Sequence, residues 1–181
     1  TKSHAPAPFT TSTMQQDASS KLGFDTSKTS KLAQVLYEGV ELKGEGKVAL
    51  ITYIRTDSVR VSEEASMKAR AFIENKFGKD YVPSRIPKYE SKKNAQDAHE
   101  AIRPININRT PEAVKDSLTP DAYKLYKLIY DRFFSSYMAE AVYHNVIVDI
   151  NCSKYGFKAT GKTVAFAGFT APKILWVKKN E

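Results

Sequence analysis

The stretch that decides the fold is TPDAYKLYKLIYDRFFSS, residues 119–136. Thr119 is a good helix cap, Pro120 is tolerated in the first helical position, and Asp121 suits the positive end of a helix dipole. The apolar positions then recur on one helical face: Ala122, Leu125, Tyr126, Ile129 and Phe133. This spacing predicts a long amphipathic helix, ending near residue 139, whose apolar face other elements must cover.

Helical signals also dominate the sequence before this stretch. Residues 12–22 run to a stop at Gly23, and residues 28–38 follow a cap at Ser27 and stop at Gly39. A third helix is expected after Ser62, and Thr110 repeats the start signal of Thr119. Between them, residues 44–46 predict a turn before a short strand over 48–53, and 79–98 predict a long polar surface loop.

The periodicity changes after residue 141. Residues 143–169, YHNVIVDINCSKYGFKATGKTVAFAGF, alternate and are rich in Val, Ile, Tyr and Phe. They predict two or three strands with turns near Lys154 and Gly161. We expect Cys152 to be a buried, inert thiol. The fold class predicted for the chain is α+β, mainly α, with a short strand and further β structure at the end.

Composition and charge exclude some classes of site and favour one class of partner. The chain has 181 residues, a net charge of +8 and one cysteine, which excludes an internal disulfide and a multi-cysteine zinc site. Basic residues outnumber acidic ones by 12 to 8 in 47–103 and by 6 to 2 in 141–181, which favours a polyanionic partner. No apolar run approaches the roughly 20 residues of a membrane helix. We expect a cytoplasmic protein without a membrane partner.

A candidate active centre lies in LITYIRTDS, residues 50–58. If this segment is extended, Tyr53, Arg55 and Asp57 leave the same face. A phenol is a poor nucleophile at neutral pH, but a neighbouring guanidinium can stabilise its attack on a phosphodiester. Thr56 and Ser58 could bind backbone phosphate. The alternative is a core tyrosine followed by a solvated loop.

A second polar cluster lies in AQDAHEAIRP, residues 95–104. His99 is flanked by Asp97, Glu100 and Arg103, and Arg103 would share its face if the segment were helical. Such a histidine could carry a proton or contact a phosphate. The alternative is a loop histidine beside a surface ion pair. A zinc protease is excluded because its motif needs a second histidine where Arg103 stands.

The two motifs together resemble the type IA DNA topoisomerases, most closely the bacterial topoisomerase I branch. PFTTSTMQQDASSKLGF at 8–24 is similar to the segment that opens the active-site tyrosine domain of that family, and LAQVLYEG at 32–39 to the helix that follows. The resemblance runs in order over about residues 6–140.

The resemblance implies an enzyme that cuts one DNA strand through a 5′-phosphotyrosine, leaves a free 3′-hydroxyl and religates without ATP, relaxing negatively supercoiled DNA. It implies single-stranded DNA as a partner. Tyr53 matches the nucleophile, Arg55 the arginine at the scissile phosphate and His99 a DNA-contacting histidine. Asp57 matches a partner of that histidine, while Thr56, Ser58 and Arg103 are candidates for DNA-binding or supporting roles.

The resemblance also implies missing parts. The family holds Mg²⁺ with an Asp-x-Asp-x-Glu set in a Toprim domain, and that spacing is absent from this sequence, as are zinc-ribbon cysteines. The implied organisation is a stub of the arch domain at 1–8, a winged-helix-like tyrosine domain at 9–140 and arch-domain strands at 141–181. The remaining Toprim and arch segments are expected partners, the chain itself is expected to bind no cofactor, and the isolated fragment is expected to be inactive.

Two other phosphotyrosine-forming classes do not fit. Tyrosine recombinases place Arg and His-x-x-Arg before the tyrosine, whereas His99 and Arg103 follow Tyr53 with a longer spacing. Rolling-circle nucleases need a His-x-His pair that this sequence lacks. The alternative to an enzyme is a noncatalytic helical module that binds single-stranded nucleic acid. The resemblance to the family also implies a bacterial, nucleoid-associated location.

Overall fold

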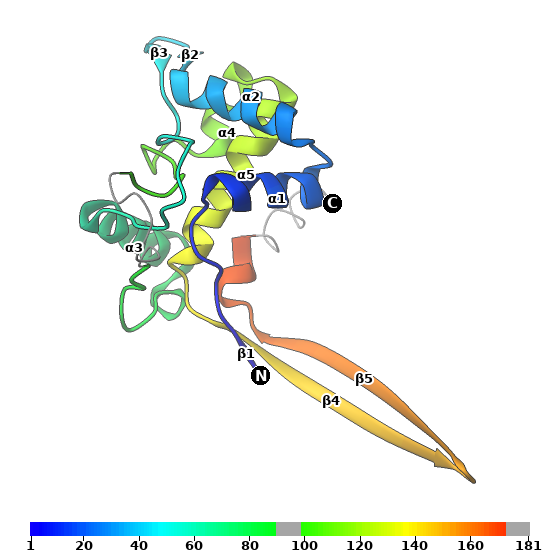
Figure 1. Cartoon of the computed structure of the whole chain (residues 1–181). Helices are drawn as coiled ribbons and strands as arrows, with labels where there is room; N and C mark the ends of the chain where they lie inside the picture. The colour runs from blue at the N-terminus through cyan, green and yellow to red at the C-terminus, as the bar shows by residue number, and fades with distance from the viewer. Residues whose placement is uncertain (90–98, 173–181) are drawn as a thin grey trace.

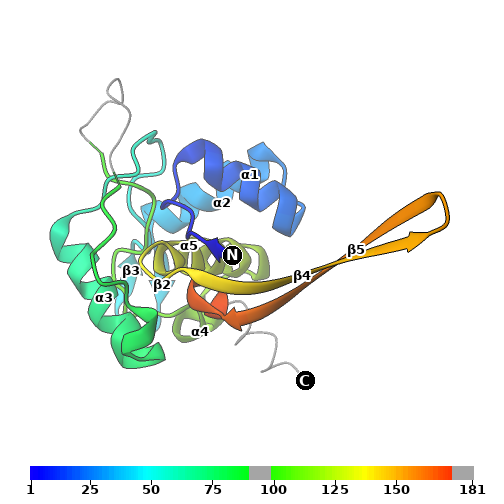
Figure 2. The same cartoon turned by 90° about the horizontal axis from the view of Figure 1, so that it is seen from below.

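A computed structural model describes residues 1–89 and 99–172. Its helical body carries one long β-hairpin that projects away from it (Figures 1 and 2). The helices are α1 (Thr11–Leu22), α2 (Thr26–Glu38), α3 (Glu63–Phe77), α4 (Pro111–Val114) and α5 (Pro120–Ser136). The strands are β1 (Lys2–Ser3), β2 (Val40–Leu42), β3 (Gly46–Val48), β4 (Ala141–Cys152) and β5 (Tyr155–Phe166). The predicted α+β, mainly α class is confirmed.

Helix α5 lies at the centre of the body, in contact with α1, α2 and α4. The whole predicted apolar stripe is buried, together with Tyr130 and Phe134. The helix ends at Ser136 rather than near residue 139, because the next residues turn. Tyr137 N–H donates to Phe134 O (2.9 Å), and Ala139 N–H donates to Tyr81 O (2.8 Å) instead of continuing the helix.

The predicted helix starts are confirmed with one correction. Hydroxyls of Ser62, Thr110 and Thr119 cap α3, α4 and α5 as expected. Helix α2 begins one residue before Ser27 and is capped by Asp25, whose carboxylate accepts from Lys28 N–H (2.7 Å). A carboxylate at this position also meets the positive end of the helix dipole, so Asp25 displaces the serine.

The prediction of a strand over 48–53 was wrong in its extent. Strand β3 stops at Val48, where it pairs with Val40 of β2. The following residues bond to several elements in turn: Leu50 N–H donates to Leu36 O of α2 (2.9 Å), and Ile51 forms an isolated antiparallel bridge with Pro104. Residues 49–53 therefore belong to no continuous sheet; Leu50 and Ile51 are buried and the other three are half-buried.

Strands β4 and β5 form a single hairpin, with register running from Val142 opposite Phe166 to Cys152 opposite Tyr155. The predicted turn near Lys154 is confirmed, but the one near Gly161 was wrong, because Gly161 pairs with Val146 in mid-strand. Cys152 lies at the hairpin tip and is exposed, not buried as expected. Strand β1 pairs with the base of β4.

The predicted surface loop at 79–98 is described only to residue 89; residues 90–98, and so Asp97, lie outside the described residues. The described part begins with the 3₁₀ turn Lys79–Tyr81 and ends at Tyr89. Tyr89 Oη donates to Ser136 O (2.5 Å), which ties this end of the loop to α5. Within the described ranges, no helix has the length and apolar character to cross a membrane.

Candidate active site

The two polar motifs lie side by side because their backbones pair. Thr52 N–H donates to Arg103 O (3.0 Å), and Arg103 N–H donates to the Thr52 hydroxyl (3.0 Å). Ile102 N–H donates to Phe9 O (2.8 Å), which brings in the third segment. Segments that begin near residues 9, 52 and 102 therefore meet over the core, and the polar side chains that flank them are brought to one place.

Thr11, at the start of α1, holds the segment that follows Tyr53. Its hydroxyl donates to Ile54 O (2.6 Å) and accepts from Thr56 N–H (2.9 Å), and its N–H donates to Thr56 O (2.9 Å). Sequence reasoning missed this residue. The hydroxyl run of residues 10–13 indicated a helix start, and nothing in it indicated which distant backbone the second threonine would bind.

Burial alternates along residues 53–58, as predicted. Tyr53 is half-buried and Arg55 and Asp57 are exposed, whereas Ile54, Thr56 and Ser58 are buried. The Thr56 hydroxyl accepts from Ser58 N–H (3.0 Å), and the Ser58 hydroxyl accepts from Arg60 N–H (3.2 Å). The Arg55 guanidinium and the Asp57 carboxylate are therefore exposed on the same side as the half-buried Tyr53 ring. The hydroxyls of Thr56 and Ser58 are buried and bind the backbone of the turn behind them.

Two rings flank the ring of Tyr53. The His99 ring lies 4.6 Å away, centroid to centroid, at an interplanar angle of 42°. The Tyr37 ring, from the last turn of α2, meets it edge-on at 5.5 Å and 68°. The prediction that His99 belongs to the same site as Tyr53 therefore has direct geometric support. Tyr37 was missed, although it stands in the LAQVLYEG segment.

The position of Tyr37 is fixed by its neighbours. Leu36 O accepts from Leu50 N–H, so the end of α2 is tied to the segment that carries Tyr53. Gly39 then reverses the chain at φ +111°, and an added Cβ would lie 3.0–3.2 Å from Lys47 Cγ and the Val48 backbone. Only glycine permits so close an approach with this backbone conformation.

Residues 99–104 of the second motif form no helix, so the condition under which His99 and Arg103 would share a helical face is not met. Ala101 N–H donates to Arg60 O (2.8 Å), next to the Ile102 bond to Phe9. The Arg103 guanidinium donates to Glu100 (2.7 Å) and to Pro104 O (3.0 Å), while the other Glu100 oxygen accepts from Ser62 N–H (3.1 Å). These contacts hold Arg103 beside the start of α3.

His99 is exposed, and no hydrogen bond joins it to Asp57 among the described residues. The predicted pairing of these two side chains therefore remains a prediction. Elsewhere in the body, burial raises the pKa of Tyr89 to about 12 and raises the pKa values of Tyr126, Tyr130 and Tyr137. Tyr126, Tyr130 and Tyr137 are buried in the core and Tyr89 is partly buried against it, and all four phenols stay protonated at neutral pH.

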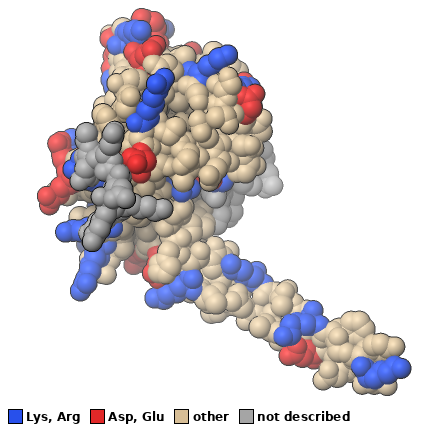
Figure 3. Space-filling model, viewed as in Figure 1, with Lys and Arg blue, Asp and Glu red and all other residues tan. Residues whose placement is uncertain are grey.

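Positive charge is spread beyond this site. Lys and Arg side chains recur along the projecting hairpin and over parts of the body (Figure 3). Lys154, Lys158 and Lys162 belong to the hairpin. In the part of the chain that the structure describes, no group of three or more His, Cys, Asp or Glu side chains could hold a metal ion.

Comparison with known proteins agrees with the geometry. The family described as DNA topoisomerase matches residues 1–181. The structure is similar to full-length topoisomerase I from Thermotoga maritima, with 44% sequence identity and a TM-score of 0.81. The match covers 94% of this chain and 27% of that one, so the chain spans about a quarter of its relative. The chain belongs to the bacterial type IA DNA topoisomerase family.

Proposed function

We propose that this chain carries the nucleophile of a type IA topoisomerase, and that Tyr53 cleaves one strand of DNA through a 5′-phosphotyrosine. The observation that carries the proposal is the half-buried Tyr53 ring, which lies beside the ring of His99 and two residues from exposed Arg55. Family membership supplies the reaction class. The whole enzyme relaxes negatively supercoiled DNA without ATP, because the phosphotyrosine conserves the energy of the broken bond.

The proposed step balances as a transesterification. Tyr53 Oη forms a bond to the scissile phosphorus and loses its proton, while the bond from phosphorus to O3′ breaks and O3′ gains a proton. Arg55 binds the non-bridging oxygens and stabilises their charge in the transition state. His99 contacts the DNA and moves protons at this site. Religation is the reverse attack by the 3′-hydroxyl.

Supporting roles follow from burial. Thr56 and Ser58 hold the turn behind the nucleophile through their backbone bonds rather than by reaching DNA. Asp57 is exposed beside Arg55, where it orients His99 once DNA is bound. Arg103 supports the site through its backbone bonds to Thr52. We propose that Mg²⁺ is held by a Toprim segment outside this chain, because the Asp-x-Asp-x-Glu spacing of the family's metal site does not occur in this sequence.

The hairpin supports the proposed domain assignment, with a tyrosine domain at 9–140 and arch-domain parts at 1–8 and 141–181. Strand β1 pairs with β4, so the two proposed arch parts join in one sheet. One hairpin face is apolar yet exposed: its side chains include Val146, Val148, Ile150 and Phe157. The opposite face is mixed, with Asn145, Asp149, Lys158 and Lys162 beside exposed Ile147 and Val164. We propose that further arch segments cover the apolar face.

A relaxation assay tests the proposal. The chain is combined with a Toprim-bearing piece of the relative, Mg²⁺ and negatively supercoiled plasmid, without ATP. Relaxation that Tyr53→Phe abolishes is the expected result, with size-exclusion chromatography confirming association of the pieces. Relaxation by the Tyr53→Phe variant would contradict the proposed nucleophile.

The isolated chain is expected to bind single-stranded DNA weakly, with an affinity that falls as salt rises, and not to cleave it. If the associated pieces bind DNA equally well in the wild type and in Tyr53→Phe, and relax it in neither, a noncatalytic nucleic-acid-binding module would be favoured instead.

A further inference from the structure

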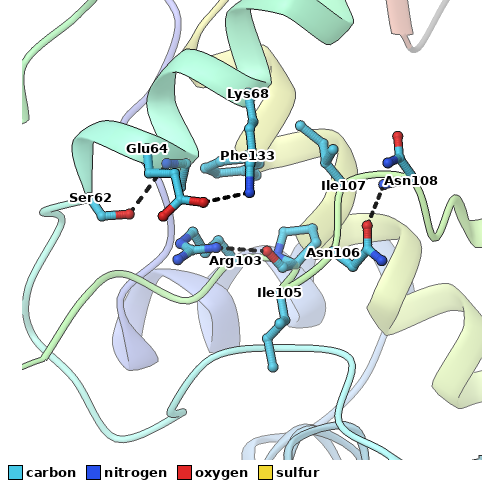
Figure 4. Close-up of a pocket in the computed structure, with 11 residues that line it drawn as sticks. Ser62, Glu64, Lys68, Arg103, Ile105, Asn106, Ile107, Asn108 and Phe133 are labelled. Carbon is cyan, nitrogen blue, oxygen red and sulfur yellow. Dashed lines mark hydrogen bonds and ion pairs between the residues drawn. The ribbon is translucent and has the colours of Figure 1, made fainter.

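The start of α3 lacks one of the two side chains of a capping box. The Ser62 hydroxyl accepts from Ala65 N–H (3.3 Å), which is half of such a box. The other half needs a glutamate or glutamine three residues after the cap, whose side chain accepts from the N–H of the cap. Residue 65 is alanine, so the usual position offers no acceptor. The nearby Glu64 carboxylate is paired with Lys68 instead (2.6 Å; Figure 4).

The glutamate next to His99 supplies the missing carboxylate. Glu100 Oε1 accepts from Ser62 N–H (3.1 Å), although the two residues are 38 positions apart in the sequence. The second oxygen, Oε2, accepts from Arg103 Nε (2.7 Å), and the Glu100 and Arg103 side chains are 27% and 15% exposed. Charge-assisted bonds that are largely shielded from water hold their partners more firmly than ion pairs at the surface.

The start of α3 is a firm anchor for this carboxylate. The Ser66 hydroxyl is bonded to Ser62 O (2.9 Å) and to Tyr137 Oη (3.1 Å). Tyr137 follows α5 and is buried in the core. Because the first turn of α3 is tied to the core in this way, Glu100 is placed relative to the core as well.

The anchor acts on His99 through a single peptide unit. Neighbouring Cα atoms are about 3.8 Å apart, so fixing Glu100 leaves His99 little freedom beyond its own dihedral angles. Among the described residues the His99 imidazole makes no hydrogen bond or ion pair, and its ring lies against that of Tyr53. Backbone bonds hold the motif from Ala101 onward, where Ala101 N–H donates to Arg60 O (2.8 Å). In the described part of the motif, Glu100 is therefore the side-chain anchor nearest to His99.

We propose that Glu100 is a positioning residue for strand cleavage: its carboxylate joins the second motif to the start of α3 and so holds the His99 ring against Tyr53. This inference rests on the proposed function, since it assumes that Tyr53 and His99 form the active site. Arg103 supports the same link, because its guanidinium is bonded to Glu100 and to Pro104 O.

Three variants separate positioning from helix capping. Glu100→Ala removes the carboxylate from both of its partners. Glu100→Ala combined with Ala65→Glu returns a carboxylate to the usual capping-box position, where it can accept from Ser62 N–H but has no link to His99. Ala65 lines a cavity of about 400 Å³, so the longer side chain has room. Glu63→Ala is the matched control, because it removes an exposed carboxylate from the same first turn.

Three measurements are made on each protein. Nuclear Overhauser effects between the ring protons of His99 and Tyr53 report on the ring contact in the chain itself. The midpoint of urea denaturation reports on stability. The rate of adduct formation is measured with a Toprim-bearing piece of the relative, Mg²⁺ and labelled single-stranded DNA.

Glu100→Ala should lose the ring contact, unfold at a lower urea concentration and form the adduct about tenfold more slowly, because small displacements in an active site are costly. The double variant should regain the urea midpoint but neither the ring contact nor the rate. Glu63→Ala should match the wild type in ring contact and rate. Recovery of both by the double variant, or their retention in Glu100→Ala, overturns the inference.

The two proposals fail differently in these measurements. An adduct that also forms in Tyr53→Phe would contradict the proposed nucleophile, while the ring contact in Glu100→Ala would still decide whether Glu100 holds His99. An adduct at Tyr53 that Glu100→Ala forms as fast as the wild type would remove the positioning role and leave the nucleophile.

Discussion

The imidazole ring of His99 lies against the phenol ring of Tyr53, 4.6 Å from centroid to centroid, although the two residues belong to separate motifs. Backbone bonds between Thr52 and Arg103, and between Phe9 and Ile102, bring the motifs together. Neither ring is placed by its own local structure, because both lie outside regular helices and strands. The site therefore depends on the tertiary contacts that hold the three segments.

Tyr37 is predicted to position the Tyr53 ring through their edge-on contact. Tyr37→Leu should move the Tyr53 ring signals in the NMR spectrum and slow adduct formation by about tenfold, because a small misplacement of a nucleophile is costly. Tyr37→Phe keeps the ring and should behave like the wild type in both measurements. A Leu variant with unshifted Tyr53 signals and an unchanged cleavage rate would contradict this role.

Thr11 is predicted to stabilise the turn after Tyr53. Thr11→Val keeps the shape of the side chain but leaves Ile54 O and Thr56 N–H without their partner, so the free energy of unfolding should fall by about 2 kcal/mol. Thr11→Ser retains the hydroxyl and should lose much less. Urea denaturation measures both, and equal losses in the two variants would show that the hydroxyl bonds are not the cause.

The contrast between the helices and the site shows what sequence can predict. The start and the apolar face of α5 follow from Thr119, Pro120 and the spacing of Leu125, so local rules sufficed. The outward direction of Tyr53, Arg55 and Asp57 followed from simple alternation. Tyr37 and Thr11 could not be found in this way, because their roles depend on which distant segment they meet.

The wrong predictions have the same origin. Gly161 looked like a turn residue, yet the register of β4 and β5 places it opposite Val146 in mid-strand. The strand expected over 48–53 stops at Val48 because its next partners are single residues of α2 and of the second motif. Cys152 was expected in a core, and the hairpin carries it to an exposed tip.

Asp131 is predicted to make stability depend on pH. Burial raises the pKa of its carboxyl, and the Lys127 ion pair opposes this only in part. Folding raises the pKa of this carboxyl, so the folded chain holds the proton more tightly than the unfolded chain does. This contribution to stability is complete at low pH, where the carboxyl is protonated in both the folded and the unfolded chain. It is lost as the pH rises through the pKa of the folded chain. Asp131→Asn should therefore gain stability relative to the wild type as the pH rises from about 4 to about 7.

Urea denaturation across that pH range checks this prediction, with exposed Asp116→Asn as the matched control. A constant difference between Asp131→Asn and the wild type at all pH values would contradict the assignment of the effect to Asp131 ionisation.

Gly168 is predicted to be essential for the join between hairpin and body. It has φ +48°, and an added Cβ would overlap the backbone carbonyl of Glu140. Gly168→Ala should lower the free energy of unfolding by at least about 2 kcal/mol, since backbone atoms must move. Gly156→Ala is the control, because its new Cβ would lie 3.6 Å from Asn151 Oδ1, an ordinary contact. Thermal unfolding compares the two, and similar melting temperatures would contradict the prediction.

The central claim is that Tyr53 becomes joined to the 5′ side of a cut strand. The most direct measurement combines the chain with a Toprim-bearing piece, Mg²⁺ and an oligonucleotide labelled at either end, then digests the product and identifies the modified peptide by mass spectrometry. The account predicts an adduct that carries only the DNA 3′ of the cut, attached at Tyr53 and lost in Tyr53→Phe. An adduct on another residue, or one that carries the 5′ part of the strand, would contradict it.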